Sequence, residues 1–370
     1  MLRILLTSSA EKNKNCVTNK RGGNMPNSLD RLVDRQYNIA QGVAKPLPLP
    51  RYDTYSICNL RGGIGKTSLA FNLTYLANSV LSVDTCPQCN LTWFFDNNYL
   101  QNSSVTVYDM LLPNFVPGLG SPSHIAKSVS ATNMKFNNRN AYYLPSDARL
   151  YILPSQVATS IVQAQTVSGQ QQIQIIDNIL FALKNNIKRE MQETQTTRCI
   201  IDTSPFFSGA THLSWHASDA LIIPVRTDQQ SVNALSLLLK TLSDPASEFR
   251  KIMPSNGHTP KIQMIVLTHC GWSTVPGARN RPNQQTKIYI EKVLDIIRQN
   301  ITQFTTSDPT NHLLLLDDFL GTGRISSAKA TPIPLLHPGE SMTIDRVRAE
   351  VNQSVEKIQN QLKYIHDSIW

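Results

Sequence analysis

The sequence contains no apolar run of about 18 residues, the length that a membrane-spanning helix needs. The stretch MLRILL at residues 1–6 is shorter than the apolar core of a signal peptide and has no small-residue cleavage pattern after it. Cysteine is scarce, with 6 residues in 370, and charged residues make up only 16% of the chain. These deficits exclude a small disulfide-stapled domain and favour an ordinary globular protein with reduced, cytoplasmic thiols.

The charge that is present is unevenly distributed. Basic residues exceed acidic ones by 9, which permits binding to nucleic acid or anionic lipid without identifying either. Residues 1–52 contain nine Lys and Arg against three Asp and Glu, a net charge of +6, whereas the rest of the chain carries +3. An anion-binding patch on the folded body therefore requires local clustering of basic side chains.

The N-terminal part of the chain differs in pattern from the rest. Residues 1–24 are polar and rich in Asn and Lys without periodicity, which predicts disorder. Residues 27–41 have apolar side chains at near-helical spacing and predict a short helix, and the Pro-rich stretch 45–51 predicts an extended linker. We therefore expect an N-terminal extension over residues 1–50 and one folded domain over residues 51–370.

From residue 54 onward, short apolar runs rich in β-branched residues alternate with longer helical patterns. The predicted strands are 54–60, 80–84, 150–154, 198–204, 220–225, 262–268 and 312–318. The predicted helices include 67–79, 170–188, 231–242, 284–300 and 342–366. This alternation predicts an α/β fold with a doubly wound, mostly parallel sheet flanked by helices. The stretch 113–147, rich in Pro, Gly, Ser and Asn, is expected to form loops and short helices.

The strongest functional signal is the stretch NLRGGIGKTSLA at residues 59–70, where Lys66 and Thr67 open a predicted helix. Glycine at positions 62, 63 and 65 lets backbone N–H groups turn inward around a polyphosphate, and the helix N-terminus adds a partial positive charge. Lys66 supplies a full charge to the outer phosphates, and the Thr67 hydroxyl is suited to Mg²⁺. The strand–loop–helix context disfavours the alternative, a glycine turn before a helix by chance.

The loop departs from the usual P-loop spacing, G-x-x-x-x-G-K-[ST], because Leu60 stands where the first glycine would be. Its pattern, R-G-G-x-G-K-T, instead resembles the deviant Walker A loop of the ParA/MinD family of ATPases, K-G-G-x-G-K-[ST]. Further stretches are similar to motifs of that family in the same order: LSVDTCPQCNLT (81–92), LYILPS (150–155), CIIDTSP (199–205), DALIIPVRTDQQSVNAL (219–235) and residues 319–351. The resemblance covers roughly residues 54–366.

The resemblance implies an ATP site with Mg²⁺. The residues implied for ATP are Gly62, Gly63, Ile64, Gly65, Lys66, Thr67 and Ser68. Those implied for Mg²⁺ are Thr67, Asp84 and Asp202, and those implied for catalysis are Arg61, Lys66, Asp84 and Cys86. Asp202 also ends an apolar strand in the crevice where ligands bind in open α/β folds. Its alternative role, a strand-end turn residue, is weaker beside a P-loop.

Cys86 and Cys89 form a Cys-x-x-Cys pair, which alone would suggest zinc or a redox dithiol. Zinc would need two further ligands, and no second Cys-x-x-Cys occurs. In the resemblance, Cys86 replaces the second acidic residue of D-x-D-P-Q, the carboxylate associated with the attacking water. A thiol cannot polarise water as a carboxylate does, and such a loss costs about 10²–10⁴ in rate. We therefore expect ATP binding with at most weak ATP hydrolysis.

Arg61 occupies the position of the family's signature lysine, which reaches across a nucleotide-sandwich dimer to the phosphates of the partner. Arginine keeps the positive charge and adds a bidentate fork, so it is suited to the same role. The resemblance thus implies an ATP-dependent homodimer.

Residues 341–370 place aliphatic side chains along one helical stripe, which is typical of an amphipathic helix packed on the sheet. In ParA-like proteins, basic residues near this helix and the loop before it bind DNA without sequence specificity. The candidates by position are Lys329, Arg346, Arg348 and Lys363, each of which is explained as readily by solvated surface charge. MinD-like relatives bind membranes through a basic C-terminal helix. The ending YIHDSIW is not rich in Lys or Arg, so membrane binding is not expected.

Two classes of function follow. The first is an ATP-dependent DNA partition protein that acts at the nucleoid with a ParB-like adaptor, binding nonspecific DNA when its dimer closes. The second is a nucleotide-gated scaffold of the same fold that scarcely hydrolyses ATP, since closure needs only a difference in affinity between states. A membrane-positioning ATPase of the MinD type is a further alternative.

Overall fold

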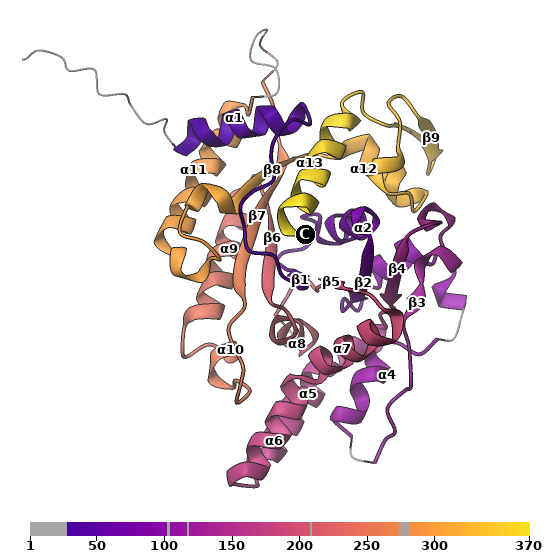
Figure 1. The fold of residues 1–370 in the computed structure, drawn as a ribbon, viewed down its shortest axis with the longest axis vertical. Helices are drawn as coiled ribbons and strands as arrows, with labels where there is room; N and C mark the ends of the chain where they lie inside the picture. Colours follow the sequence, from indigo (N-terminus) through magenta and orange to yellow (C-terminus); the bar gives the residue numbers. More distant parts are fainter. Residues whose placement is uncertain (1–27, 102–103, 117, 208, 274, 276–280) are drawn as a thin grey trace, which may run out of the picture.

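The computed structural model describes residues 28–370 except 102–103, 117, 208, 274 and 276–280. The predicted polar tail at residues 1–24 lies outside these residues. Among the described residues, eight strands form one sheet in the order β3-β4-β2-β5-β1-β6-β7-β8, with helices on both sides of it (Figure 1). Neighbouring strands pair in parallel except for β3 and β4. The predicted fold class, a mostly parallel and doubly wound α/β sheet, is confirmed.

The strands of this sheet are β1 (Thr54–Ile57), β2 (Ser79–Asp84), β3 (Lys127–Ser128), β4 (Asn140–Leu144), β5 (Arg198–Asp202), β6 (Ala220–Arg226), β7 (Lys261–Cys270) and β8 (Leu313–Asp317). A separate hairpin consists of β9 (Ser341–Ile344) and β10 (Val347–Glu350). The α-helices are α1 (Ser28–Ala40), α2 (Lys66–Leu76), α3 (Asn90–Phe95), α4 (Val107–Leu111), α5 (Leu153–Ala164), α6 (Gly169–Leu180), α7 (Ala182–Thr194), α8 (Gly209–Ala217), α9 (Gln229–Ser243), α10 (Glu248–Lys251), α11 (Gln284–Gln299), α12 (Leu320–Ala328) and α13 (Val355–Ile369).

Both faces of the sheet are buried, which explains why its strands read as continuous apolar runs. Successive side chains of a strand point to opposite faces. Leu314 and Leu316 of β8 join the core that contains α2 and α13, whereas Leu313 and Leu315 join the core that contains α9 and α11. The helical stripe predicted near the C-terminus is part of the first core from Val355 onward, because its aliphatic side chains are fully buried there.

Helix α1, which precedes the predicted 51–370 domain, packs along the free edge of the sheet at β8 (Figure 1). Gln36 donates a hydrogen bond to the carbonyl oxygen of Leu315 at 3.2 Å, and Arg35 donates one to the carbonyl oxygen of Thr310 at 2.8 Å. An edge strand presents unpaired backbone groups that invite association with other chains. Helix α1 therefore covers part of this edge and supplies a hydrogen-bond donor to a backbone carbonyl group of β8.

The predicted strand at residues 150–154 is wrong, because a short helical turn and the start of α5 occupy this segment. Leu150, Leu153 and Val157 are buried at helical spacing, and Pro154 lies in the first turn of α5, where its missing N–H has no cost. The strand is instead β4, which pairs with β2 and is followed by Pro145 and Ser146. Residues 113–147, expected to form loops and short helices, thus supply two strands of the main sheet, β3 and β4.

The predicted helix at residues 342–366 is wrong over its first part, where β9 and β10 form a hairpin. Its turn residues, Asp345 and Arg346, both have positive φ angles, of 48° and 66°. Two consecutive residues of this kind are typical of the tight type I′ turn that matches the twist of a hairpin. The predicted helix at 170–188 is divided at Phe181 into α6 and α7. None of the helices in the described residues has the length and apolar character needed to cross a bilayer.

Candidate functional site

The glycine-rich loop lies between β1 and α2, at the carboxyl end of β1. Strand β1 is flanked by β5 and β6. From β1 the chain runs to β2, β3 and β4 on one side and returns through β5, after which it crosses to β6, β7 and β8 on the other side. Open α/β folds bind ligands in the crevice at such a switch point. Gly63 and Gly65 have φ angles of 68° and 92°, a backbone conformation that other residues rarely adopt. A Cβ atom at either position would meet no atom within 4 Å, so the turn and not crowding requires glycine.

Three of the predicted site residues meet at the start of α2. The Thr67 hydroxyl donates a hydrogen bond to Asp202 Oδ2 at 2.7 Å, which joins α2 to the end of β5. The ammonium group of Lys66 donates to the carbonyl oxygen of Arg61 at 2.7 Å and so turns back over the loop. Burial and the nearby Asp84 carboxylate raise the pKa of Asp202 above its ordinary value, whereas burial lowers the pKa of Lys66.

The residues at this point fit a nucleotide with Mg²⁺. Asp202 Oδ1 is buried, and no described residue donates a hydrogen bond to it. A buried carboxylate oxygen without a partner is costly, and an oxygen ligand beside a threonine hydroxyl is the donor set that Mg²⁺ prefers. Gly63 and Gly65 leave open space around the loop for an anion. The predicted positions of Lys66, Thr67 and Asp202 are thus brought together by the fold.

A hollow of about 200 Å³ opens beside the loop, and we call it the phosphate hollow. Its lining includes the predicted residues Lys66, Thr67 and Cys86. The remaining lining residues are Gly62, Gly63, Ile64, Gly65, Ser68, Gln88, Asn90, Thr203 and Pro205. Gln88, Asn90 and Thr203 were not singled out from the sequence, although the first two belong to the P-Q-x-N part of the stretch at residues 81–92.

Asp84 lies one strand away from this point and holds the neighbouring loop in place. It is fully buried and opposite Asp202 in the β2–β5 register. Its carboxylate accepts hydrogen bonds from Cys86 N at 3.0 Å and from both the backbone N–H and the hydroxyl of Thr92 at 2.8 Å. Burial nevertheless raises its pKa above the ordinary value. A direct role for Asp84 at Mg²⁺ would require one of these three hydrogen bonds to open.

Cys86 and Cys89 lie at the two ends of a tight turn, closed by a hydrogen bond from Cys89 N to Cys86 O at 2.9 Å. Both are free thiols, and burial raises the pKa of Cys86 to about 12 and that of Cys89 to about 11. At neutral pH they are therefore protonated, which disfavours both metal binding and thiol exchange. Among the described residues, no group of three or more His, Cys, Asp or Glu side chains could hold a metal ion.

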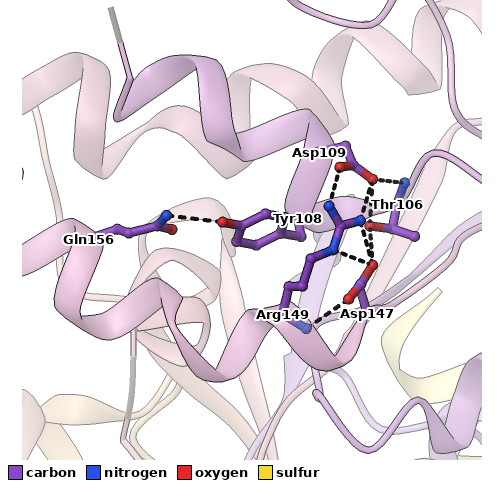
Figure 2. Close-up of polar contacts among 6 residues, drawn as sticks. All are labelled: Thr106, Tyr108, Asp109, Asp147, Arg149 and Gln156. Atoms are coloured by element: carbon purple, nitrogen blue, oxygen red, sulfur yellow. Dashed lines mark hydrogen bonds and ion pairs between the residues drawn. The ribbon is translucent and has the colours of Figure 1, made fainter.

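A cluster of polar side chains anchors the segment that follows β4 (Figure 2). The Arg149 guanidinium donates hydrogen bonds to Asp109 at 2.8 Å and to Asp147 at 2.6 Å, and Thr106 and Asp109 form a capping box at the start of α4. The adjacent Ser146 hydroxyl donates to the carbonyl oxygen of Cys86 at 2.6 Å. The cluster thus ties the wall of the phosphate hollow to α4.

A second hollow of about 530 Å³ begins on the other side of the loop, between the ends of β7 and β8 and helix α12. It shares Gly63, Ile64, Gly65 and Ser68 with the phosphate hollow. Its other lining residues are Thr268, His269, Leu316, Asp317, Asp318, Phe319, Leu320, Gly323, Arg324 and Ser327. Thr268 lies at the end of the predicted strand 262–268, whereas the wall from β8 and α12 was not predicted from the sequence.

Arg61 points back into its own subunit. Its guanidinium forms an ion pair with Asp228, the residue that caps α9, and donates a hydrogen bond to Ser231 Oγ at 2.7 Å. Burial alone would raise the pKa of Asp228, but hydrogen bonds from Ser231 N and Arg61 outweigh it and lower this pKa. The predicted reach of Arg61 to a second subunit therefore requires this pair to open.

A larger hollow, of about 720 Å³, lies at the opposite ends of the strands, where β1 and β5 begin. Three of its charged lining residues have partners within the chain: Arg198 pairs with Asp53 at 2.8 Å, and Asp219 accepts a hydrogen bond from Thr54 N at 2.9 Å. It lacks the glycine loop and helix start that favour a polyphosphate. The nucleotide candidate is the site at the carboxyl ends.

The basic residues predicted to contact DNA fall into two groups. Arg346 occupies the exposed turn of the β9–β10 hairpin, Arg348 lies on β10, and Lys329 ends α12, which packs against this hairpin. Lys329 is 3.8 Å from Glu340. Lys363 lies instead on α13, where it pairs with Asp367 of the same helix. The structure thus places three of the four candidates around the hairpin.

Comparison with known proteins identifies the family to which this chain belongs. A family model described as an AAA domain matches residues 53–253. A curated relative, an uncharacterized protein of Methanocaldococcus jannaschii, is 26% identical over 194 residues. The match spans 51% of this chain and 64%, less than two thirds, of that relative.

Solved structures share the fold. McdA from Cyanothece, in a variant bound to ATP, has a TM-score of 0.53 at 19% identity and covers 76% of this chain and 89% of its own. The structure of McdA without a nucleotide also has a TM-score of 0.53 at 19% identity, covering 84% and 99%. A Borrelia burgdorferi protein described as a plasmid partition protein, bound to AMPPNP, has a TM-score of 0.50 at 16% identity, covering 85% and 98%.

Proposed function

Because this chain belongs to the AAA domain family and has the fold of ParA/MinD-like P-loop ATPases, we propose that it is an ATP-gated DNA partition protein. It binds ATP with Mg²⁺, closes into a homodimer, binds DNA without sequence preference and positions a DNA cargo. The observation that carries the proposal is the meeting of Lys66, Thr67 and the unpartnered oxygen of Asp202 beside the glycine loop.

ATP would lie across the glycine loop and use both hollows. The triphosphate would occupy the phosphate hollow, where the backbone N–H groups around Gly63 and Gly65 and the start of α2 favour negative charge. The base and ribose would occupy the larger hollow between β7, β8 and α12. The shared loop residues make this one continuous site. McdA bound to ATP and the Borrelia protein bound to AMPPNP support a nucleotide in this fold.

Mg²⁺ bound at Thr67 and Asp202 would offset the negative charge on the β- and γ-phosphates. In that state the Thr67 hydroxyl would turn from Asp202 toward the ion, and Lys66 would leave the carbonyl oxygen of Arg61 for a phosphate. Each of these groups exchanges an internal hydrogen bond for a stronger charge-assisted one. The cation would then offset the electrostatic repulsion between the buried carboxylates of Asp84 and Asp202.

Hydrolysis is expected to be slow in this protein. Cys86 faces the phosphate hollow as a protonated thiol, because burial and the Asp84 carboxylate raise its pKa to about 12. It therefore offers no general base for the attacking water, and the expected cost is about 10²–10⁴ in rate. Slow hydrolysis suits a protein whose ATP-bound dimer persists until an adaptor protein stimulates hydrolysis.

DNA binding is assigned to the β9–β10 hairpin and the end of α12. Arg346, Arg348 and Lys329 project from exposed positions of this unit, and contacts of this kind to phosphates carry no sequence information. Lys363 is separate from the hairpin and paired with Asp367, so it is the weakest of the four candidates. The partition role given to the Borrelia protein supports DNA as the cargo.

The main alternative is a nucleotide-gated scaffold that binds ATP but scarcely hydrolyses it, which the protonated thiol at position 86 favours. The membrane-positioning alternative has less support, because the apolar stripe of α13 is used in the core. Ile358, Leu362, Ile365 and Ile369 are at most 1% exposed. An amphipathic helix can enter a bilayer surface only with a free apolar face.

Calorimetry with ATP and Mg²⁺, followed by light scattering of the protein with and without ATP, tests binding and dimer formation. DNA binding is then measured with the ATP-bound protein at several salt concentrations. Single-turnover hydrolysis of wild type and Cys86→Asp separates the two alternatives, with and without DNA. A large increase in rate in Cys86→Asp identifies a degenerate switch, whereas no ATP uptake by the wild type contradicts the proposal.

A further inference from the structure

The phosphate hollow lacks a group that could activate water by removing its proton. None of its described lining residues is an aspartate or glutamate. Asp202 is assigned to Mg²⁺ in the proposed complex, and Asp84 accepts three hydrogen bonds from Cys86 and Thr92. Cys86 is a protonated thiol. Within this chain, the group available to hydrolysis at this site is therefore a neutral one that holds the water in line with the γ-phosphate.

Two carboxamide side chains line the hollow, beside the hydroxyls of Thr67, Ser68 and Thr203, and each carries both donors and an acceptor. Gln88 and Asn90 come from the same loop, and Asn90 Nδ2 donates to Gln88 Oε1 at 3.4 Å. An amide oxygen has two lone pairs, so Gln88 Oε1 can accept a second hydrogen bond from water. Both side chains are exposed at the mouth of the hollow, where water enters.

The backbone of Gln88 is held in a fixed position. It is the third residue of the turn from Cys86 to Cys89, and Pro87 occupies the second position, which proline favours in β-turns. Asp84 accepts from Cys86 N at one end of this turn, and the Ser146 hydroxyl donates to Cys86 O at 2.6 Å. Because these contacts already order the backbone, binding a water costs entropy only in the Gln88 side chain.

We propose that Gln88 orients the water that attacks the γ-phosphate of ATP, and that Asn90 positions the Gln88 side chain for this task. The proposal rests on the ATP site proposed above and names the residue that allows turnover without a carboxylate. Gln88 Oε1 accepts a hydrogen bond from the water, while its Nε2 group donates to an oxygen of the γ-phosphate. A glutamine used in this way is known chemistry in phosphoryl transfer.

The reaction requires no base from the protein. The water oxygen forms a bond to the γ-phosphorus as the bond between this phosphorus and the β–γ bridging oxygen breaks, and the electron pair of that bond leaves with ADP. An amide does not accept a proton at neutral pH, so the proton of the water passes to an oxygen of the departing phosphate. ADP and inorganic phosphate are the products, and Gln88 is unchanged.

Single-turnover hydrolysis by the full-length protein with Mg²⁺ tests the proposal. We expect Gln88→Ala to lower the rate of phosphate release by roughly 10²-fold, while its affinity for ATP stays within about twofold of the wild type. The variant should also fail to trap ADP with aluminium fluoride, a mimic of the transition state. Gln174→Ala, at an exposed position of α6, is the matched control and should behave as wild type.

A double-mutant cycle tests the part assigned to Asn90. If Asn90 acts through Gln88, Asn90→Ala lowers the rate by less than Gln88→Ala, and the double variant is no slower than Gln88→Ala alone. A purely structural effect would also lower ATP affinity. This inference is overturned if Gln88→Ala hydrolyses ATP as fast as the wild type. It is also overturned if the wild type binds ATP without hydrolysing it. Neither result contradicts the proposed ATP site. A wild type that binds no ATP overturns the proposed function itself.

Discussion

Arg61, at the entrance of the phosphate loop, is paired with Asp228, which caps helix α9 of the same chain. The Ser231 hydroxyl accepts a further hydrogen bond from the Arg61 guanidinium. Arg61 stands where the resemblance places a lysine that reaches a second subunit. The pair with Asp228 therefore holds this side chain inside its own subunit, and we expect dimer formation to exchange this contact for one with the phosphates bound by the partner.

The Arg61–Asp228 pair should set the ease of dimer formation. We predict that Asp228→Asn strengthens ATP-dependent dimerisation by about two- to fivefold, the range expected for a partly exposed ion pair. Asparagine still accepts the hydrogen bond from Ser231 N, so the cap of α9 remains. Analytical ultracentrifugation with ATP and Mg²⁺ measures the dimer constant.

The matched control for this prediction is Asp295→Asn, which removes the exposed partner of Arg298 on α11. It should leave the dimer constant unchanged. Arg61→Ala should abolish dimerisation and retain ATP binding. A dimer that forms equally well in Arg61→Ala would rule out a role for Arg61 across the interface.

Asp202 should destabilise the nucleotide-free protein at neutral pH. Burial raises its folded pKa above the unfolded value near 3.9, so its contribution to stability is present at low pH and is lost as the pH rises through the folded pKa. We predict that Asp202→Asn raises the free energy of unfolding by at least about 1 kcal/mol at pH 8, with a smaller gain near pH 4. Thermal unfolding without nucleotide at both pH values measures this difference.

The same substitution should remove the extra stability that ATP with Mg²⁺ gives to the wild type, because it replaces a carboxylate ligand with a neutral amide. A gain in stability that does not depend on pH would mean that the substitution acts through packing and not through the charge of Asp202.

Cys86 and Cys89 should be chemically inert in the native protein. Burial raises their pKa values to about 12 and about 11, far above that of an exposed thiol. We predict slow modification of both by iodoacetamide at pH 8, and fast modification once urea has unfolded the chain, with peptide mass spectrometry as the readout. Rapid labelling of either thiol in the native state, or zinc that copurifies with the protein, would restore the redox or metal alternative.

The β9–β10 hairpin should carry part of the DNA affinity. We predict that Arg346→Ala and Arg348→Ala each reduce the slope of log affinity against log salt by about 1, equally for DNA of any sequence. Arg298→Ala, on α11, is the matched control. Fluorescence anisotropy with ATP-bound protein at several salt concentrations measures the slopes, and unchanged slopes would move the DNA site elsewhere.

The phosphate loop could be predicted from the sequence because its chemistry is local. Residues 59–70 contain the turn, the lysine and the helix start in one stretch, and Asp202 ends a run that reads as a strand. The hollow between β7, β8 and α12 could not be predicted, because its walls are joined only by the tertiary fold. The intramolecular contact between Arg61 and Asp228, which are 167 residues apart, is hidden for the same reason.

Two segments were misassigned because one pattern fits two structures. Leu-Pro-Ser occurs at residues 144–146 and 153–155, and only the first follows a strand, β4, while the second opens α5. The spacing of Ile344, Val347 and Val351 matches a helical stripe, yet Asp345 and Arg346 form a tight turn between two strands. Where residues have no strong preference for helix or strand, tertiary contacts determine the secondary structure. Here the contacts are those between the hairpin and α12.

Calorimetric titration of wild type and Lys66→Ala with ATP and Mg²⁺ tests the account most directly. Lys66 is the charged side chain that the account places on the outer phosphates of the ATP bound by its own subunit. We predict saturable uptake by the wild type and a loss of affinity of at least about 10²-fold in Lys66→Ala, as expected when a charge-assisted contact to phosphate is removed. No uptake by the wild type, or equal affinity in the two proteins, would contradict the account.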